Sequence, residues 1–259
     1  MNTRSLLLVF FLFLFFSKSE VYSQFGFSHE VGIITGSVVF YSDFGQRNNL
    51  KTNAGNVGFG VGLIHYLNFS YRSDCNCYTR DKYFNDHFKL RNEIDYHKTN
   101  LEHLGEYVAP DKTSVFSDQL RAMKGSTQVI EIGSQLEFFP LSIRDFAAGA
   151  FRIAPFISAG AHYVSFDPEV YSELGPLNTP ISTPPKYFNS FQQEGGSTWA
   201  FVGSVGIRYK LTELSDLMLD SRWHYYFSNW VDGLNPDVPE NKATEWVYWL
   251  NIGYIYYLD

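Results

Sequence analysis

The feature that most constrains this chain is a strict two-residue alternation of side-chain character over residues 86–98. Successive side chains of a β-strand point to opposite faces, so this pattern predicts a strand with two unlike faces. One face carries Phe88, Leu90, Asn92, Ile94 and Tyr96, and the other carries His87, Lys89, Arg91, Glu93, Asp95 and His97. One face of this strand is therefore charged throughout.

Similar alternation recurs along the chain and predicts eight strands, an even number. They are expected at 29–41, 57–69, 86–98, 127–139, 150–164, 198–209, 216–228 and 246–258. The connections alternate between long segments (42–56, 99–126, 165–197 and 229–245) and shorter ones (70–85, 140–149 and 210–215). Bacterial outer-membrane barrels have long outer loops and short periplasmic turns. We therefore predict an all-β, eight-stranded antiparallel transmembrane β-barrel with both termini in the periplasm.

The loop at 165–197 contains several prolines and glycines, and it is expected to be irregular. Loops of this length are usually either functional or disordered. A partner-binding or surface-shielding role and simple disorder both remain open for it.

A soluble sandwich or a lipocalin would show the same alternation with its apolar face inward. Two features favour the membrane instead. The polar faces mix both signs of charge with small residues, which suits a lumen just wide enough for side chains. Lys89 and Arg91 are expected to pair in this lumen with carboxylates such as Glu131 and Glu137. The last strand also resembles the insertion signal of outer-membrane barrels, through Asn251, Gly253, Tyr256 and Leu258. The predicted lumen charge network comprises Lys89, Arg91, Glu93, Asp95, Glu131, Glu137, Asp220 and Arg222.

The first residues predict a signal peptide. Arg4 precedes an apolar run over residues 6–16, which is too short for a membrane-spanning helix, and a small residue, Ser23, stands at the expected cleavage point. The alternative is a buried core helix. We expect residues 1–23 to be removed on export and residues 24–259 to form one outer-membrane β-barrel domain, because all-β domains of this size commonly form a single unit.

The amino-acid composition limits the classes of partner that the protein is expected to have. An aromatic content of 18% fits strands with aromatic girdles, and membrane lipid and the outer-membrane insertion machinery are the expected partners. A net charge of −7 argues against nucleic acid. No small-molecule substrate or cofactor is indicated.

Catalytic and metal motifs are weak. The sequence contains neither G-x-S-x-G nor H-E-x-x-H, and His97, His162 and His224 fall on predicted lumen faces, where a structural histidine is the commoner case. An active site assembled across strands would leave no local motif, so an enzyme stays open as a minor alternative. The only cysteines, Cys75 and Cys77, lie in one turn. A disulfide between them, a disulfide with a partner cysteine elsewhere and a metal site are the alternatives. We prefer a structural role in which they staple the turn. We expect no enzyme activity and no metal.

The chain resembles the PorG-like outer-membrane proteins of the type IX secretion system of Bacteroidota. The resemblance is carried by the order and spacing of HEVG at 29–32, YSDFG at 41–45, QLEFFP at 135–140, APFISAG at 154–160, FDP at 166–168, GSVGIRYK at 203–210 and SNWVD at 228–232. It implies an eight-stranded barrel whose periplasmic side meets the ring of the secretion machine. The chain departs from the family pattern at Asp232-Gly233 and at Cys75-Asn76-Cys77, so a paralogue with another partner is the alternative.

Four functions compete. The leading one is a non-enzymatic barrel that anchors an envelope complex, with secretion-ring subunits as partners, through periplasmic turns that contain Arg80, Arg144 and Asp145. The second is a self-contained structural or adhesive barrel that acts through its long outer loops. A pore is disfavoured because eight strands with charged inner faces leave little free lumen. An enzyme at the lumen edge is the fourth.

Overall fold

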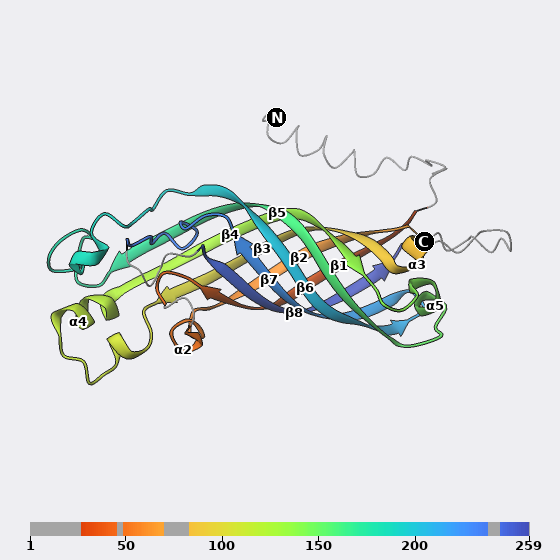
Figure 1. Ribbon diagram of the computed structural model, residues 1–259, viewed down its shortest axis with the longest axis horizontal. Coiled ribbons are helices and arrows are strands. Elements are labelled where there is room, and N and C mark those ends of the chain that lie inside the picture. The colour runs from red at the N-terminus through yellow and green to blue at the C-terminus, as the bar shows by residue number, and fades with distance from the viewer. Residues whose placement is uncertain (1–26, 46–48, 70–82, 238–243, 259) are drawn as a thin grey trace, which may run out of the picture.

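The structure is a computed structural model that describes residues 27–45, 49–69, 83–237 and 244–258. Eight antiparallel strands form a closed barrel in which each strand pairs with its sequence neighbours and β8 pairs with β1 (Figure 1). This confirms the predicted fold class. The strands are β1 (Ser28–Tyr41), β2 (Val57–Asn68), β3 (Phe88–Glu102), β4 (Met123–Phe138), β5 (Ile153–Ser172), β6 (Gly196–Thr212), β7 (Ser215–Tyr226) and β8 (Trp246–Tyr257). The signal-peptide prediction for residues 1–23 lies outside the described residues.

The two ends of the barrel differ. One end, called here the short-turn end, carries α3 (Tyr83–His87), α5 (Ile143–Ala147) and the end of β8 (Figure 1). The other, called the long-loop end, carries α2 (Leu50–Asn53), η1 (Glu106–Val108), α4 (Val115–Ala122) and η2 (Pro185–Tyr187). Outer-membrane barrels direct their short turns to the periplasm.

Several predicted strand boundaries were wrong. The middle strands run further toward the long-loop end than expected, so β3 ends at Glu102, β4 begins at Met123 and β5 ends at Ser172. The segment 165–172, predicted as irregular loop, is regular strand. The start of the third strand was placed too early, because residues 86 and 87 belong to α3.

The fifth predicted strand included Pro155, but Pro168 fell in the segment that was predicted as loop. Pro155 pairs only with β6, and Pro168 pairs only with β4, because β5 overhangs its neighbours at both ends. A proline cannot donate to a ladder, and it is tolerated where a strand is paired on one side only. Both prolines therefore fit inside a regular strand.

The polarity of the barrel is the reverse of that of a soluble protein. Large apolar side chains face outward, for example Phe59, Leu63 and Ile252 at 61%, 62% and 62% exposure, while Arg91, Arg208 and Arg222 are fully buried inside. An apolar outer surface around a polar interior is the arrangement of an outer-membrane barrel, because closure satisfies every ladder hydrogen bond without water. The chain is therefore an outer-membrane β-barrel. Within the described ranges, no helix is long and apolar enough to cross a membrane.

A band of phenylalanine rings marks the short-turn edge of the apolar surface. Phe27, Phe69, Phe84, Phe88 and Phe138 form a continuous series, with ring centroids 5.8, 5.0, 4.7 and 5.1 Å apart. Aromatic girdles of this kind lie at the membrane–water interface. The band therefore sets the level of the membrane at this end.

Candidate functional site

The lumen is filled with charged side chains in three layers, beginning at the short-turn end. The basal layer comprises Glu30, Lys89, Arg208, Lys210 and Asp216, all buried. Glu30 accepts from Lys89 Nζ at 2.7 Å and from Arg208 Nη2 at 2.6 Å. Asp216 lies 3.8 Å from Arg208 Nε and 3.7 Å from Lys210 Nζ. Every charge in this layer therefore has an opposite charge beside it.

Aromatic rings complete the basal layer. The Arg208 guanidinium lies 4.6 Å from the centroid of the Tyr66 ring, and Lys210 Nζ lies 4.2 Å from that of Tyr257. Phe139 and Phe146 are buried below them. Contacts of cations with ring faces are favourable, and they are stronger away from water. The short-turn end of the lumen is thus closed by rings packed against cations.

The central layer comprises Arg91, Glu93, Asp95, Glu137, Asp220 and Arg222. Arg91 Nη1 donates to Glu137 at 2.7 Å and to Asp220 at 3.3 Å. Arg222 contacts three carboxylates, at 3.0 Å to Glu93, 3.1 Å to Asp95 and 2.8 Å to Asp220. Removing one partner of such a buried pair costs about 3–5 kcal/mol, because the other charge is left uncompensated.

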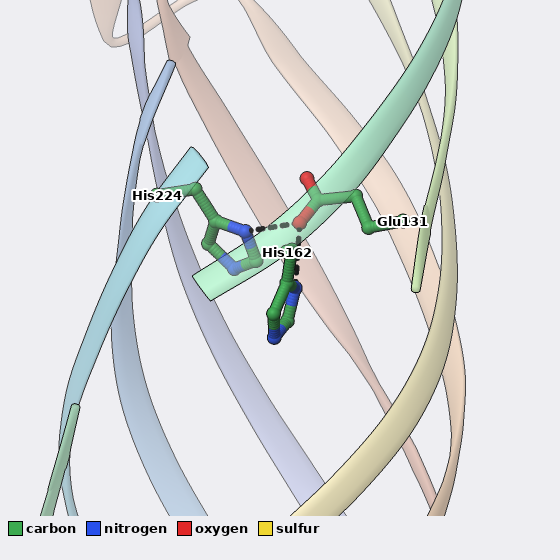
Figure 2. Close-up of side chains that lie close together, drawn as sticks. All are labelled: Glu131, His162 and His224. Carbon is green, nitrogen blue, oxygen red and sulfur yellow. Dashed lines mark hydrogen bonds and ion pairs between the residues drawn. The ribbon is translucent and has the colours of Figure 1, made fainter. Parts of the chain in front are cut away.

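The histidine layer comprises His97, Glu131, His162, His224 and Tyr226, and lies nearest the long-loop end. Figure 2 shows both His162, on β5, and His224, on β7, pointing at Glu131. Their Nδ1 atoms lie 2.9 and 2.7 Å from the same oxygen, Glu131 Oε2. Tyr226 donates to the other oxygen, Oε1, at 2.8 Å. This layer therefore surrounds one carboxylate with titratable rings.

Residues 227–237, which follow β7, close the long-loop end. Val231 and Leu234 are fully buried in the core cluster, and Thr127 Oγ1 donates to the carbonyl of Val231 at 2.6 Å. Beside them lies an acidic group, here called the cap carboxylates, which consists of Asp43, Asp232 and Glu245. The amide of Asp43 donates to Asp232 at 2.7 Å, and the amide of Asp232 donates to Glu245 at 3.2 Å.

Burial raises the pKa of all three cap carboxylates. The pKa of Asp43 is raised to about 9 by burial and by the neighbouring Asp232 charge, and burial raises that of Asp232 to about 7. The pKa of Glu245 is raised well above its ordinary value by burial and by Asp232. The raised pKa values favour the protonated forms of these groups near neutral pH, and the amide donors partly offset the rise at Asp232.

The structure places all eight predicted network residues inside the barrel and pairs Arg91 with Glu137 as expected, but the pairings expected for Lys89 and Glu131 were wrong. Glu131 contacts His162, His224 and Tyr226 rather than Lys89 or Arg91. Lys89 pairs with Glu30. The predictions missed the basal residues Glu30, Arg208, Lys210 and Asp216, although the same two-residue alternation places each of them on the inner face of its strand.

The remaining predicted residues lie on the surfaces. Arg144 and Asp145 are exposed in α5 at the short-turn end. Tyr256 and Leu258 face outward, while Asn251 and Gly253 face inward, as alternation requires; their role as an insertion signal stays a prediction. Cys75, Cys77 and Arg80 lie outside the described residues.

One row of polar side chains interrupts the lipid-facing surface. His29 Nδ1 lies 3.0 Å from His65 Nε2, Asn92 Nδ2 lies 3.4 Å from His65 Nδ1, and Ser134 Oγ donates to Asn92 at 2.6 Å. Apolar side chains flank the row on the same strands, such as Ile94 on β3. The row lies four residues along the tilted strand from the phenylalanine band, which corresponds to about 10 Å toward the centre of the membrane. We call His29, His65, Asn92 and Ser134 the flank row.

Comparisons with known proteins found similarity in structure but not in sequence family. No protein-family model matches the chain, and a search of curated proteins found none that matches. Similar solved structures include Neisserial surface protein A, with 13% identity over 89% of this chain and 98% of that chain and a TM-score of 0.48. A major outer membrane protein from Thermus thermophilus has 14% identity over 89% of this chain and 100% of that chain, with a TM-score of 0.48. Ail of Yersinia pestis has 12% identity over 88% and 99%, with a TM-score of 0.40. The assignment as an outer-membrane barrel rests on the closed strand pairing and the reversed polarity.

Proposed function

We propose that this chain is a non-enzymatic outer-membrane barrel that anchors or organises an envelope complex through its periplasmic end and its flank. The observation that carries this proposal is the filled lumen. Charged side chains occupy its three layers, aromatic rings close its short-turn end, and residues 227–237 cover its long-loop end. A barrel filled in this way acts through its outer surfaces rather than as a channel.

The short-turn end offers an ordered surface for a periplasmic partner. Ser142 caps α5 by accepting from the amide of Asp145 at 3.2 Å. Arg144 Nη2 lies 3.0 Å from Asp86 Oδ1, which ties α5 to α3. Exposed charges held on fixed elements favour specific docking, because little side-chain freedom is lost on binding.

The flank row supports a contact inside the membrane as well. Polar groups facing hydrocarbon cost free energy, and hydrogen bonds among themselves offset only part of that cost. A protein surface with matching donors and acceptors would replace lipid favourably at Asn92 and Ser134. This argues for a membrane-embedded partner beside β1 to β4.

For the identity of the complex, we propose the periplasmic ring of a type IX secretion machine. The resemblance to PorG-like proteins supports this, and so does the position of the exposed α5 charges at the end where such a ring would lie. Subunits of that ring are the proposed partners.

The test is a pull-down from cells that carry a tagged chromosomal copy, with gentle extraction and mass spectrometry. Wild-type protein should recover ring subunits, and Arg144→Glu should lose them. The swapped double variant Asp86→Arg with Arg144→Glu restores the internal ion pair, so its continued failure to bind would assign the loss to surface charge rather than to misfolding. Lys186→Glu, at the long-loop end, is the matched control and should bind normally. Full recovery of partners by Arg144→Glu and by the swapped variant would contradict the anchoring role.

A second candidate is adhesion through the long-loop end. The loops there are held together, since Gln119 Nε2 donates to the carbonyls of Pro180 at 2.8 Å and Ile181 at 3.0 Å. Ile181, Val115 and Phe116 are exposed nearby, at 71%, 67% and 55%. Exposed apolar groups on an ordered scaffold are typical of interaction sites. Val115→Asp with Phe116→Ser should then abolish surface attachment and leave the periplasmic partners bound.

A further inference from the structure

Three potential metal ligands converge inside the barrel from three strands. Glu131 on β4, His162 on β5 and His224 on β7 each direct one ligand atom into a common space, and these atoms lie within 4.8 Å of one another (Figure 2). All three side chains are fully buried. Residues this far apart in sequence leave no local motif.

His162 lies between two carboxylates. Its Nδ1 is 2.9 Å from Glu131 Oε2, and its Nε2 is 3.1 Å from Glu93 Oε1. A neutral imidazole has one N–H and one lone pair, so it cannot face two carboxylates favourably. The arrangement therefore requires either one more proton, on the ring or on one of the two carboxyl groups, or a metal ion at one nitrogen.

The balance of charges in the lumen also favours a bound cation. The basic side chains buried in the described strands are Lys89, Arg91, Arg208, Lys210 and Arg222, and the acidic ones are Glu30, Glu93, Asp95, Glu131, Glu137, Asp216 and Asp220. The acids exceed the bases by two, and within these strands the histidine layer contains an acid, Glu131, without Lys or Arg beside it. One divalent cation would neutralise this excess, and buried charge without compensation is costly.

We propose that Glu131 Oε2, His162 Nδ1 and His224 Nδ1 bind a divalent transition-metal ion of the Zn²⁺ class. Two imidazoles and one carboxylate are the ligand types that Zn²⁺ takes in three-ligand sites, whereas Ca²⁺ and Mg²⁺ prefer oxygen alone. The two nitrogens lie 2.9 and 2.7 Å from Oε2. Neighbouring ligands of tetrahedral zinc are about 3.3 Å apart, so the side chains need to separate by about 0.5 Å.

The surrounding groups are arranged as partners of metal ligands usually are. Glu93 faces Nε2 of His162, which fixes the tautomer that leaves the Nδ1 lone pair for the metal. Tyr226 donates to Glu131 Oε1 at 2.8 Å, which leaves Oε2 for the ion. The ion would tie β4, β5 and β7 together across the lumen.

The test uses the full mature chain, refolded in detergent after chelation. Zn²⁺ binding is measured by elemental analysis after dialysis and by competition with a chromogenic chelator, and Co²⁺ serves as a spectroscopic probe. We expect one metal ion per barrel, a visible Co²⁺ spectrum typical of four-coordination, and slower unfolding in urea with Zn²⁺. Heat-modifiable migration on gels checks that each variant is folded.

His224→Gln and Glu131→Gln should lose stoichiometric binding. Glu93→Gln should retain the ion with an affinity lowered about 10–100-fold, since it removes only the group that orients a ligand. His97→Gln is the matched control, because His97 Nε2 lies 3.7 Å from Glu131 Oε1, outside the ligand set. Wild-type barrel that binds neither Zn²⁺ nor Co²⁺ would overturn the proposal. So would equal loss of binding in His97→Gln and His224→Gln.

Discussion

The basal layer and the histidine layer occupy the same lumen but balance their charges differently. In the basal layer, Glu30 forms direct ion pairs with two basic side chains, Lys89 and Arg208. In the histidine layer, Glu131 is surrounded by imidazoles and a phenol, whose charges depend on a proton or on a bound ion. One end of the barrel is therefore held by carboxylates paired with Lys and Arg, whereas at the other end a carboxylate is paired with histidines and a tyrosine.

The largest effect is expected from a substitution that breaks the ion pairs of the basal layer. Glu30→Gln leaves two buried cations facing a neutral amide, and the free energy of unfolding should fall by about 3–5 kcal/mol. Urea unfolding of the barrel in lipid vesicles measures this. The matched control is Glu173→Gln, which breaks an exposed ion pair with Lys124 and should cost about 0.5 kcal/mol at most. Equal small losses in both variants would show that the basal pairs contribute little.

A smaller effect is expected in the central layer. Arg222→Lys keeps the positive charge, but the lysine cannot reach Glu93, Asp95 and Asp220 with one planar group. We therefore expect the free energy of unfolding to fall by about 1–3 kcal/mol in the same assay. Arg144→Lys, in an exposed position, is the control and should change stability little. If Arg222→Lys is as stable as the wild type, the fork geometry of Arg222 is unimportant.

The smallest expected effect concerns pH at the long-loop end. The cap carboxylates have pKa values raised by burial, to about 9 for Asp43 and about 7 for Asp232. Unfolded carboxyls titrate near pH 4, so the folded cap retains protons that the open state releases, and its stability should fall as the pH rises from about 4 through neutrality.

Hydrogen exchange of amides near Leu234 measures this local opening. Exchange corrected for its intrinsic pH dependence should show easier opening at higher pH in wild type, and Asp43→Asn should flatten the dependence. Opening that becomes harder as pH rises would reverse the sign and contradict the protonated cap.

The sequence predicted the barrel because alternation is a local property. Each strand shows which side chains face inward, and this placed Arg91, Arg222 and Glu131 correctly inside the lumen. The pairings depend on strand register and on which walls face each other across the lumen. Arg91 on β3 meets Asp220 on β7, which no local pattern encodes.

The histidine layer was missed as a metal-binding candidate for the same reason. His162 and His224 were recognised as inward-facing, but their convergence on Glu131 results from closure of the barrel around β4, β5 and β7. Pro168 of β5 caused the opposite error. Proline is a real local signal for a loop, but the free edge created by staggered strand ends makes Pro168 compatible with a strand.

The central claim, a barrel that works through its surfaces because its lumen is filled, is tested most directly by conductance in a planar lipid bilayer. Purified barrel should insert, as shown by protection of its strands from protease, and should give no steady openings, while a porin in the same bilayer gives its usual channels. Steady, reproducible openings from the inserted wild-type barrel would contradict the account and assign the protein to transport.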